Sequence, residues 1–315
     1  MTAPILEGRG LRFGHDPARP VLDGADVAFP AGRRTAVLGP NGGGKTTLFR
    51  LLAGALVPQE GRVLLDGEPV GPRRRGRGAG GLTALRRAVQ LVLQDPDDQL
   101  FSATVAQDVS FGPVNLGLPD DVVRTRVAGA LAALGVADLA DRPVHRLSFG
   151  QRKRVTIAGA VAMAPRLLVL DEPTAGLDPA GVEALLEVLA ALHAAGTTTV
   201  LSTHDVDLAW RWADDVAVVV DRRVTAGPAA ALLGDAALLA AAGLGPAWAP
   251  AVHRLLARAG VSAYPRTAAE LAAVLVSDAT GADARDRVAG GTVESGTQTS
   301  APHGASEETS CPTRS

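Results

Sequence analysis

The chain has 315 residues, a formal net charge of −2 and 47% hydrophobic residues, which is enough for one large domain and a smaller unit. The near-neutral charge argues against a general nucleic-acid binder, and the single cysteine, Cys311, has no disulfide partner within the chain. No uninterrupted apolar run reaches the roughly 20 residues of a membrane-spanning helix, and the N-terminus lacks a signal-peptide pattern, so we expect a soluble or peripheral protein.

The first part of the chain predicts short strands, and the last of them, over 34–38, leads into a phosphate-loop sequence. Residues 39–47 match the pattern G-x-x-x-x-G-K-[ST], and a helix is expected over 47–56. A glycine-rich loop between a strand and a helix lets backbone N–H groups surround a phosphate chain. Lys45 would reach the β- and γ-phosphates of a nucleotide, and the Thr46 hydroxyl would bind Mg²⁺. The residues expected to bind the nucleotide are Gly39, Pro40, Asn41, Gly42, Gly43, Gly44, Lys45, Thr46 and Thr47.

The alternative interpretation of this segment is a glycine-rich turn with a chance lysine. Composition favours the functional one. Lys45 and Lys153 are the only lysines in a chain whose other basic side chains are arginines, which suggests that the compact charge of Lys45 has a specific role.

Polar residues also follow later strands. An apolar strand over 167–170 ends in Asp171 and Glu172, and another over 198–201 leads to His204. In phosphate-loop ATPases the first acid completes the Mg²⁺ shell and the second polarises the attacking water. Other elements expected are a strand over 89–93 followed by Gln94, helices over 120–140, about 152–164 and 181–195, and a strand over 216–220. Strands alternating with helices predict a mostly parallel sheet covered on both faces.

Three segments stand apart by composition. Residues 71–81 hold four arginines among glycines, and we expect a flexible loop, with contact to RNA or anionic lipid as the alternative. Residues 235–276 predict a small C-terminal helical unit. Residues 277–315 have little to bury, and we expect them to be disordered. The domain boundaries that follow are 1–234 for the main domain, with a helical subdomain at about 95–165, then 235–276 and 277–315.

The segment Leu147–Gln151 reads Leu-Ser-Phe-Gly-Gln and, with the motifs above, resembles the nucleotide-binding subunits of ATP-binding-cassette (ABC) transporters. Their signature is Leu-Ser-Gly-Gly-Gln, so Phe149 is a departure at one of the two glycine positions, while Ser148 and Gly150 remain. The resemblance covers residues 4 to about 230. Its elements occur in the family's order: the phosphate loop, a glutamine loop at Gln94, the signature, the acids Asp171 and Glu172, the loop 175–178 and a switch histidine at His204.

The resemblance implies an α/β phosphate-loop ATPase with a mostly parallel core sheet, an N-terminal antiparallel β subdomain and a helical subdomain. It implies ATP and Mg²⁺ as cofactors, with Thr46, Gln94 and Asp171 at the metal. The catalytic set would be Lys45, Gln94, Glu172 and His204. Ser148, Gly150, Gln151 and Asp178 would bind ATP, and in the family the signature serine acts on the ATP of the other subunit in a head-to-tail dimer. His15 would stack on adenine, or else would be a turn residue, with Phe13 in the core.

The stretch 94–119 resembles the ATPases of energy-coupling-factor importers, above all the cobalt and nickel group. In those importers two ATPase subunits, identical or merely similar, dock beneath a membrane scaffold (T-type) protein, and a small membrane protein captures the substrate. The chain would then lie on the cytoplasmic face of the membrane. Apolar residues after Gln94 would form a groove for a scaffold helix, or else would pack locally: Leu100, Phe101, Phe111, Pro113, Leu116 and Leu118.

Alternatives remain open at this point. The substrate of such an importer could be a vitamin. A soluble ABC ATPase acting on the ribosome or DNA would resemble two fused domains or carry long coiled-coil insertions. A phosphate-loop kinase would need an acceptor site and has no use for Leu147–Gln151.

Overall fold

The computed structural model describes residues 3–16, 18–70, 80–261, 263 and 265–276. Most of the arginine-glycine stretch and the whole segment 277–315 lie outside these residues, so the expectations for them stay predictions. The chain divides into two compact units, residues 1–266 and 267–315. In the second unit the described residues form a helix over 268–276. Everything that follows concerns the first unit.

A six-stranded sheet forms the centre of this unit, with the order β10-β9-β3-β8-β7-β6. All neighbouring strands in it run parallel except β9 and β10, which form an antiparallel pair at one edge. Its strands are β3 (Arg34–Leu38), β6 (Val89–Val92), β7 (Leu167–Leu170), β8 (Thr198–Thr203), β9 (Asp215–Val220) and β10 (Arg223–Pro228). Every residue of β7 and β8 is buried, as expected for strands covered on both faces.

A second, antiparallel sheet has the order β2-β1-β4-β5. It consists of β1 (Pro4–Phe13), β2 (Leu22–Pro30), β4 (Glu60–Leu65) and β5 (Glu68–Val70). Burial alternates along the second half of β2, so one face of this sheet packs inward. Its buried residues share a core cluster with helix α1 (Lys45–Leu52) and with residues of the central sheet. The two sheets and the helices between them confirm the predicted α/β fold with an antiparallel N-terminal part.

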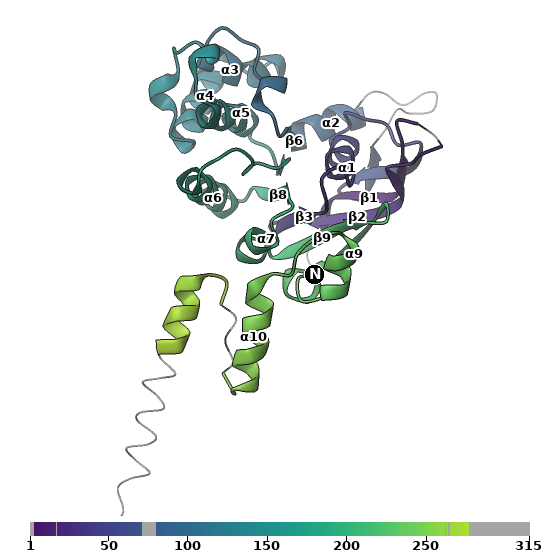
Figure 1. Cartoon of the computed structure of the whole chain (residues 1–315). Helices are drawn as coiled ribbons and strands as arrows, with labels where there is room; N and C mark the ends of the chain where they lie inside the picture. The colour runs from purple at the N-terminus through teal and green to yellow at the C-terminus, as the bar shows by residue number, and fades with distance from the viewer. Residues whose placement is uncertain (1–2, 17, 71–79, 262, 264, 277–315) are drawn as a thin grey trace, which may run out of the picture. The chain divides into compact units, whose positions relative to one another are not determined.

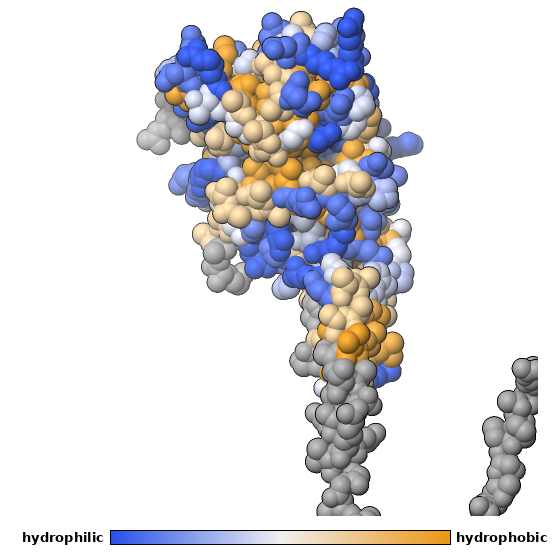
Figure 2. Space-filling view, turned by 90° about the vertical axis from the view of Figure 1, so that its left-hand side faces the viewer, coloured by the Kyte–Doolittle hydropathy of each residue, from blue (hydrophilic) through white to orange (hydrophobic). Residues whose placement is uncertain are grey.

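Three helices form a group of their own beyond the β6 edge of the central sheet (Figure 1). They are α3 (Val105–Asn115), α4 (Asp120–Ala133) and α5 (Phe149–Ala162), and they pack on one another. The other helices are α2 (Gly80–Ala88), α6 (Pro179–Ala194), α7 (Val206–Trp212), α8 (Ala229–Leu232), α9 (Ala236–Ala241) and α10 (Trp248–Arg258). Figure 2 views the molecule from the side of the helical group, and apolar side chains gather there near the middle of a largely hydrophilic face. None of the described helices is long and apolar enough to cross a membrane.

The structure moves several predicted helix boundaries and adds elements. Helix α1 covers Lys45–Leu52 instead of 47–56, and α4 ends at Ala133 instead of 140. Helix α5 begins at Phe149, so the segment Leu147–Gln151 does not precede the helix as predicted but forms its start. Ser148 is the N-cap, and its side chain and that of Gln151 form a capping box. The elements that were not predicted separately are helices α2, α3, α7 and α8 and strands β5 and β10.

Candidate functional site

Polar side chains converge at the carboxyl ends of three adjacent strands, β3, β8 and β7. Lys45 and Thr46 open α1 after β3, Asp171 and Glu172 follow β7, and His204 follows β8. Because parallel strands end at the same edge of a sheet, residues far apart in the sequence meet there. The structure therefore brings together the phosphate-loop lysine and threonine, both acids and the histidine that the sequence singled out.

The phosphate loop curls between β3 and α1. Gly42 and Gly44 have φ angles of 75° and 102°, which are left-handed conformations that favour glycine. A Cβ at Gly43 would approach Pro40 to 3.0 Å. The loop borders a cavity of about 480 Å³, a size usual for small-molecule sites. The cavity is lined by His15, Val21, Pro40, Asn41, Gly42, Gly43, Gly44, Lys45, Thr46, Thr47, Gln94 and Glu172.

The Lys45 side chain is buried, with 6% of its surface exposed. Its Nζ donates hydrogen bonds to the main-chain oxygens of Gly39, at 2.8 Å, and Pro40, at 3.2 Å. The same atom lies 3.1 Å from Glu172 Oε1. Lys45 therefore holds a positive charge at the start of α1, directly beside the cavity, where an anionic ligand would be bound.

Asp171 lies at the centre of a short chain of hydroxyl contacts. Its Oδ2 accepts a hydrogen bond from Thr46 Oγ1 at 2.5 Å, and its Oδ1 accepts one from Ser202 Oγ at 2.6 Å. A carboxylate oxygen and a hydroxyl oxygen in contact suit a hard cation such as Mg²⁺, which protein sites bind through few protein ligands and the phosphates of a substrate. The described residues contain no group of three or more His, Cys, Asp or Glu that could hold a metal ion.

Glu172 adopts a left-handed backbone conformation, with φ of 45°, which is unusual for a residue with a side chain. Its N–H donates to Ser202 Oγ at 2.8 Å, and its carboxylate contacts Lys45 and, at 3.2 Å, His204 Nδ1. Glu172 is buried, with 6% of the residue's surface exposed, so its carboxylate has little access to solvent. The backbone conformation aims this acid at the phosphate loop.

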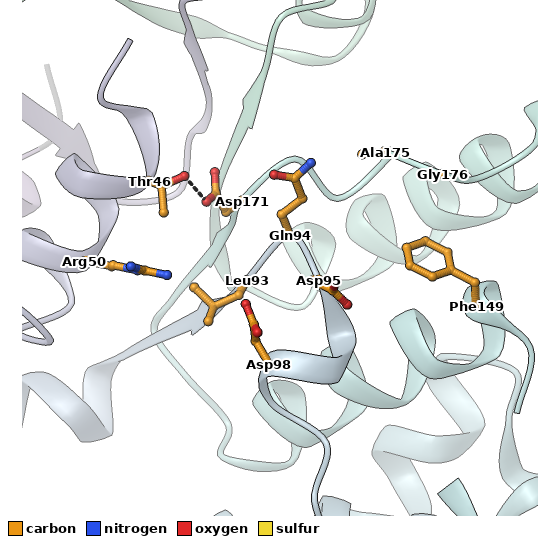
Figure 3. Close-up of a pocket in the computed structure, with 10 residues that line it drawn as sticks. All are labelled: Thr46, Arg50, Leu93, Gln94, Asp95, Asp98, Phe149, Asp171, Ala175 and Gly176. Carbon is orange, nitrogen blue, oxygen red and sulfur yellow. Dashed lines mark hydrogen bonds between the residues drawn. The ribbon is translucent and has the colours of Figure 1, made fainter. Parts of the chain in front are cut away.

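Gln94 lies beside the Thr46–Asp171 pair (Figure 3). It borders the cavity of the phosphate loop and also a second cavity of about 430 Å³. The second cavity is lined by Thr46, Arg50, Leu93, Gln94, Asp95, Asp98, Phe149, Asp171, Ala175 and Gly176. Gln94 is thus the one predicted site residue outside the phosphate loop that lines both cavities.

His15 and Phe13 lie next to each other, with ring centroids 5.3 Å apart and planes at 88°. Phe13 is half-buried and packs against the core of the antiparallel sheet, while His15 is exposed and borders the phosphate-loop cavity. Of the two, His15 is therefore the ring that is free to meet a ligand.

The remaining predicted site residues lie outside both cavities: Ser148, Gly150, Gln151 and Asp178. Ser148 and Gln151 form the capping box of α5, with contacts of 2.9 and 3.3 Å. Asp178 caps α6 and accepts a hydrogen bond from the Gly181 N–H at 2.8 Å. Within one chain these residues do not touch the Lys45–Glu172 site.

Sequence reasoning missed two residues that the structure places at this site. Ser202 links the Glu172 N–H to the Asp171 carboxylate, and Lys153 contacts the Glu172 main chain from the opposite side. Ser202 is the fifth residue of a buried strand, and its polarity there was the only available signal. For Lys153 the signal was its rarity, since the chain has a single other lysine.

Comparison with known proteins adds independent findings. The model of the ABC transporter family matches residues 22–175. The cobalt import ATP-binding protein CbiO of Rhodobacter capsulatus is 54% identical over 278 residues, which cover 86% of this chain and 96% of that protein. The energy-coupling factor transporter ATP-binding protein EcfA3 of Clostridium perfringens is 45% identical over 221 residues, covering 70% and 76%. The solved structure of cbiO1 from Clostridium perfringens, described as part of the ABC transporter complex cbiONQ, matches with a TM-score of 0.66 and 40% identity, over 82% of this chain and 98% of that one.

Proposed function

We propose a function from one premise: the chain belongs to the ABC transporter family of ATP-binding proteins, which hydrolyse ATP to drive transport. From this premise we infer that the chain is the motor subunit of an energy-coupling-factor-type importer, with cobalt or nickel ions as the transported substrate. The identity of 54% with a cobalt import ATP-binding protein over almost its whole length supports the cobalt assignment. A vitamin importer of the same type is the alternative.

The observation that carries the ATPase assignment is the contact of Glu172 with both Lys45 and His204, beside the Thr46–Asp171 pair. In this proposal Lys45 and the loop N–H groups bind the β- and γ-phosphates. Glu172 accepts the proton of the attacking water, and His204 hydrogen-bonds the γ-phosphate.

Magnesium fits the oxygen atoms present at this site. Thr46, Asp171 and Gln94 would hold it, and when bound it neutralises charge on the phosphates. Gln94 borders both cavities, so it would sense the metal and the γ-phosphate together.

The residues outside the cavities suggest a dimer. Ser148, Gly150, Gln151 and Asp178 lie at the starts of α5 and α6, and we infer that they meet the ATP of a second ATPase subunit, either a copy of this chain or a similar one. The N-terminus of α5 presents free N–H groups to such an anion. The Ser148 hydroxyl accepts the capping bond through a lone pair, which leaves its proton available to the ligand.

A groove of about 560 Å³ supports attachment to a membrane partner. Phe101 and Phe111 line it in an edge-to-face contact with centroids 4.7 Å apart, and they are 65% and 51% exposed. Leu100 and Leu116 line it as well, whereas Pro113 is buried and Leu118 packs on the core. We infer that the groove binds a helix of the membrane scaffold protein. Apolar side chains of that helix would pack between the two phenylalanines and Leu116. A small membrane protein would deliver the substrate to that scaffold, and the chain would be peripheral on the cytoplasmic face.

Substitution of Glu172 tests the chemistry. Glu172→Gln should lower the hydrolysis rate by about 10²–10⁴-fold, because it removes a positioned base, while ATP binding persists. ATP-bound dimers should accumulate and elute early in gel filtration. Glu183→Gln is the matched control, since it removes a carboxylate from an exposed ion pair between Glu183 of α6 and Arg211 of α7. Hydrolysis by Glu172→Gln at close to the wild-type rate would rule out Glu172 as the base.

Uptake measurements test the substrate. The chain, its scaffold and the substrate-capture protein are produced together in cells, and uptake of radioactive cobalt, nickel and vitamins is compared with the same cells carrying Glu172→Gln. We expect cobalt or nickel uptake that the substitution abolishes. Uptake of a vitamin instead would keep the importer and overturn the metal. No uptake of any of these substrates, together with no co-purification of the chain with the scaffold, would favour a soluble ABC ATPase.

A further inference from the structure

Lys153 is almost completely buried, with 1% of its surface exposed. It lies in the second turn of α5, two residues after Gln151. Its Nζ donates hydrogen bonds to two main-chain oxygens, of Glu172 at 3.1 Å and of Ala175 at 2.9 Å. Among the described residues no carboxylate forms a direct ion pair with it, although Glu172, Asp95 and Asp171 are near enough to act on its charge.

A lysine in this position is costly to bury. Desolvation by burial lowers the pKa of Lys153 to about 8, although the nearby acids act in the opposite direction. An apolar residue of similar length would fill the same space without that cost. The ammonium group therefore has a role beyond packing, and its two acceptors indicate what the role is.

Both acceptors belong to the turn that follows β7. The Glu172 oxygen accepts the Ala175 N–H at 3.1 Å, which closes the turn, and the same oxygen accepts the Lys153 ammonium. On the other side of the residue, the Glu172 N–H donates to Ser202. The left-handed backbone of Glu172 is thus held at both of its peptide groups by side chains from other elements, Ser202 of β8 and Lys153 of α5.

Phe149 covers the ammonium from the direction of the second cavity. Lys153 Nζ lies 5.5 Å from the centroid of the Phe149 ring, within the range of a cation–π contact. The ring also lies against Gly176, where an added Cβ would come within 2.7 Å of Phe149 Cε1. The aromatic residue in the signature segment therefore packs on the loop after Glu172 and shields the lysine.

We propose that Lys153 is a positioning residue for ATP hydrolysis, which fixes the Glu172 main chain and the loop at 175–178 against the start of α5. The proposal rests on the proposed role of Glu172 as the base. As a consequence, the segment Ser148–Gln151 and Glu172 move together. Contact of this segment with ATP on a second subunit then sets the position of Glu172. The hydrogen bonds of Lys153 itself go to the turn after β7 and not to the phosphate loop.

The test compares Lys153→Met with the wild type. Methionine keeps the length and the burial but cannot donate to the two oxygens. We expect kcat to fall about 10–100-fold, the loss typical of a misplaced catalytic group, with the KM and the Kd for ATP changed less than threefold. Lys153→Gln, which retains a shorter donor, should recover part of the rate. Arg154→Met is the matched control, since Arg154 has one long contact, at 3.5 Å, to Gly135 and none to Glu172.

Combination with Glu172→Gln separates positioning from a general structural role. If Lys153 acts through Glu172, adding Lys153→Met to Glu172→Gln should lower the single-turnover rate less than twofold further. A combined loss equal to the product of the two single losses would overturn the proposal, as would a kcat for Lys153→Met within twofold of the wild type, or a fall in kcat matched by an equal loss of ATP affinity. Near wild-type hydrolysis by Glu172→Gln alone would instead remove the base assignment on which the proposal rests.

Discussion

The buried charge of Lys153 predicts that the protein becomes more stable as the solution becomes alkaline. Its pKa falls from 10.5 to about 8 on folding, so between these two values the unfolded chain binds the proton more tightly than the folded chain. Stability rises with pH wherever the unfolded state holds more protons, so the cost is fully present below about pH 8 and is relieved as pH rises toward 10.5. At about 1.4 kcal/mol for each pH unit, the effect reaches roughly 3 kcal/mol.

The alkaline range is suited to this measurement because few other groups titrate there. The chain has two lysines, one tyrosine and one cysteine, and its arginines stay charged. Urea unfolding of the nucleotide-free protein, followed by circular dichroism at intervals from pH 7 to 10.5, gives the free energy of unfolding at each pH. Lys153→Met is the reference, since it lacks the titrating group.

The quantity to compare is the difference in unfolding free energy between the wild type and Lys153→Met. We expect this difference to shift in favour of the wild type by about 2–3 kcal/mol between pH 8 and pH 10.5. A difference that stays constant over this range, or that moves against the wild type, would refute the reasoning. It would mean that Lys153 keeps its ordinary pKa and that the two main-chain oxygens compensate its burial.

Two further predictions concern the phosphate loop and the groove. Lys45→Ala should weaken ATP binding itself, by at least about tenfold in Kd, because it removes the buried cation beside the loop; isothermal titration should show this loss, and unchanged affinity would contradict the role of Lys45. Phe111→Asp should abolish co-purification with the membrane scaffold and metal uptake, while the isolated protein still binds ATP. Val114→Asp is its matched control, because Val114 is 55% exposed on the same helix but does not line the groove, and assembly that is equally normal in both variants would exclude the groove as the docking site.

The sequence alone predicted the location of a candidate-site residue wherever that residue follows an apolar strand. Lys45, Asp171 and His204 each come directly after, or within a short loop of, such a strand, and parallel strands bring these positions together. The parallel core followed from the alternation of strands and helices, whereas the antiparallel N-terminal sheet was predicted from the resemblance to the ABC family. Local sequence was enough in these cases because the strand ends themselves carry the chemistry.

What the sequence did not predict depends on contacts between distant elements. The left-handed conformation of Glu172 is held by Ser202 and Lys153, which are separated from it by 30 and 19 residues. No local pattern marks either contact. The start of α5 is a different case, because Ser148 and Gln151 have the spacing of a capping box and the boundary at Phe149 was available from the sequence. The resemblance to the signature drew attention to ligand binding instead of helix capping.

Positions 148 and 149 of the signature segment are constrained in different ways during evolution. Ser148 caps a helix, whereas Phe149 packs on a neighbouring loop. A helix N-cap accepts few residue types, and of these only serine and threonine also carry a hydroxyl donor, so position 148 is restricted by folding as well as by any ligand. The next position has no capping duty, and its ring lies where a side chain at position 176 would otherwise be. Gly176 also has a φ of 76°, which favours glycine by itself. Position 176 is therefore restricted twice, by its own backbone and by the ring at 149, so a small residue at 149 would remove only one of the two restrictions.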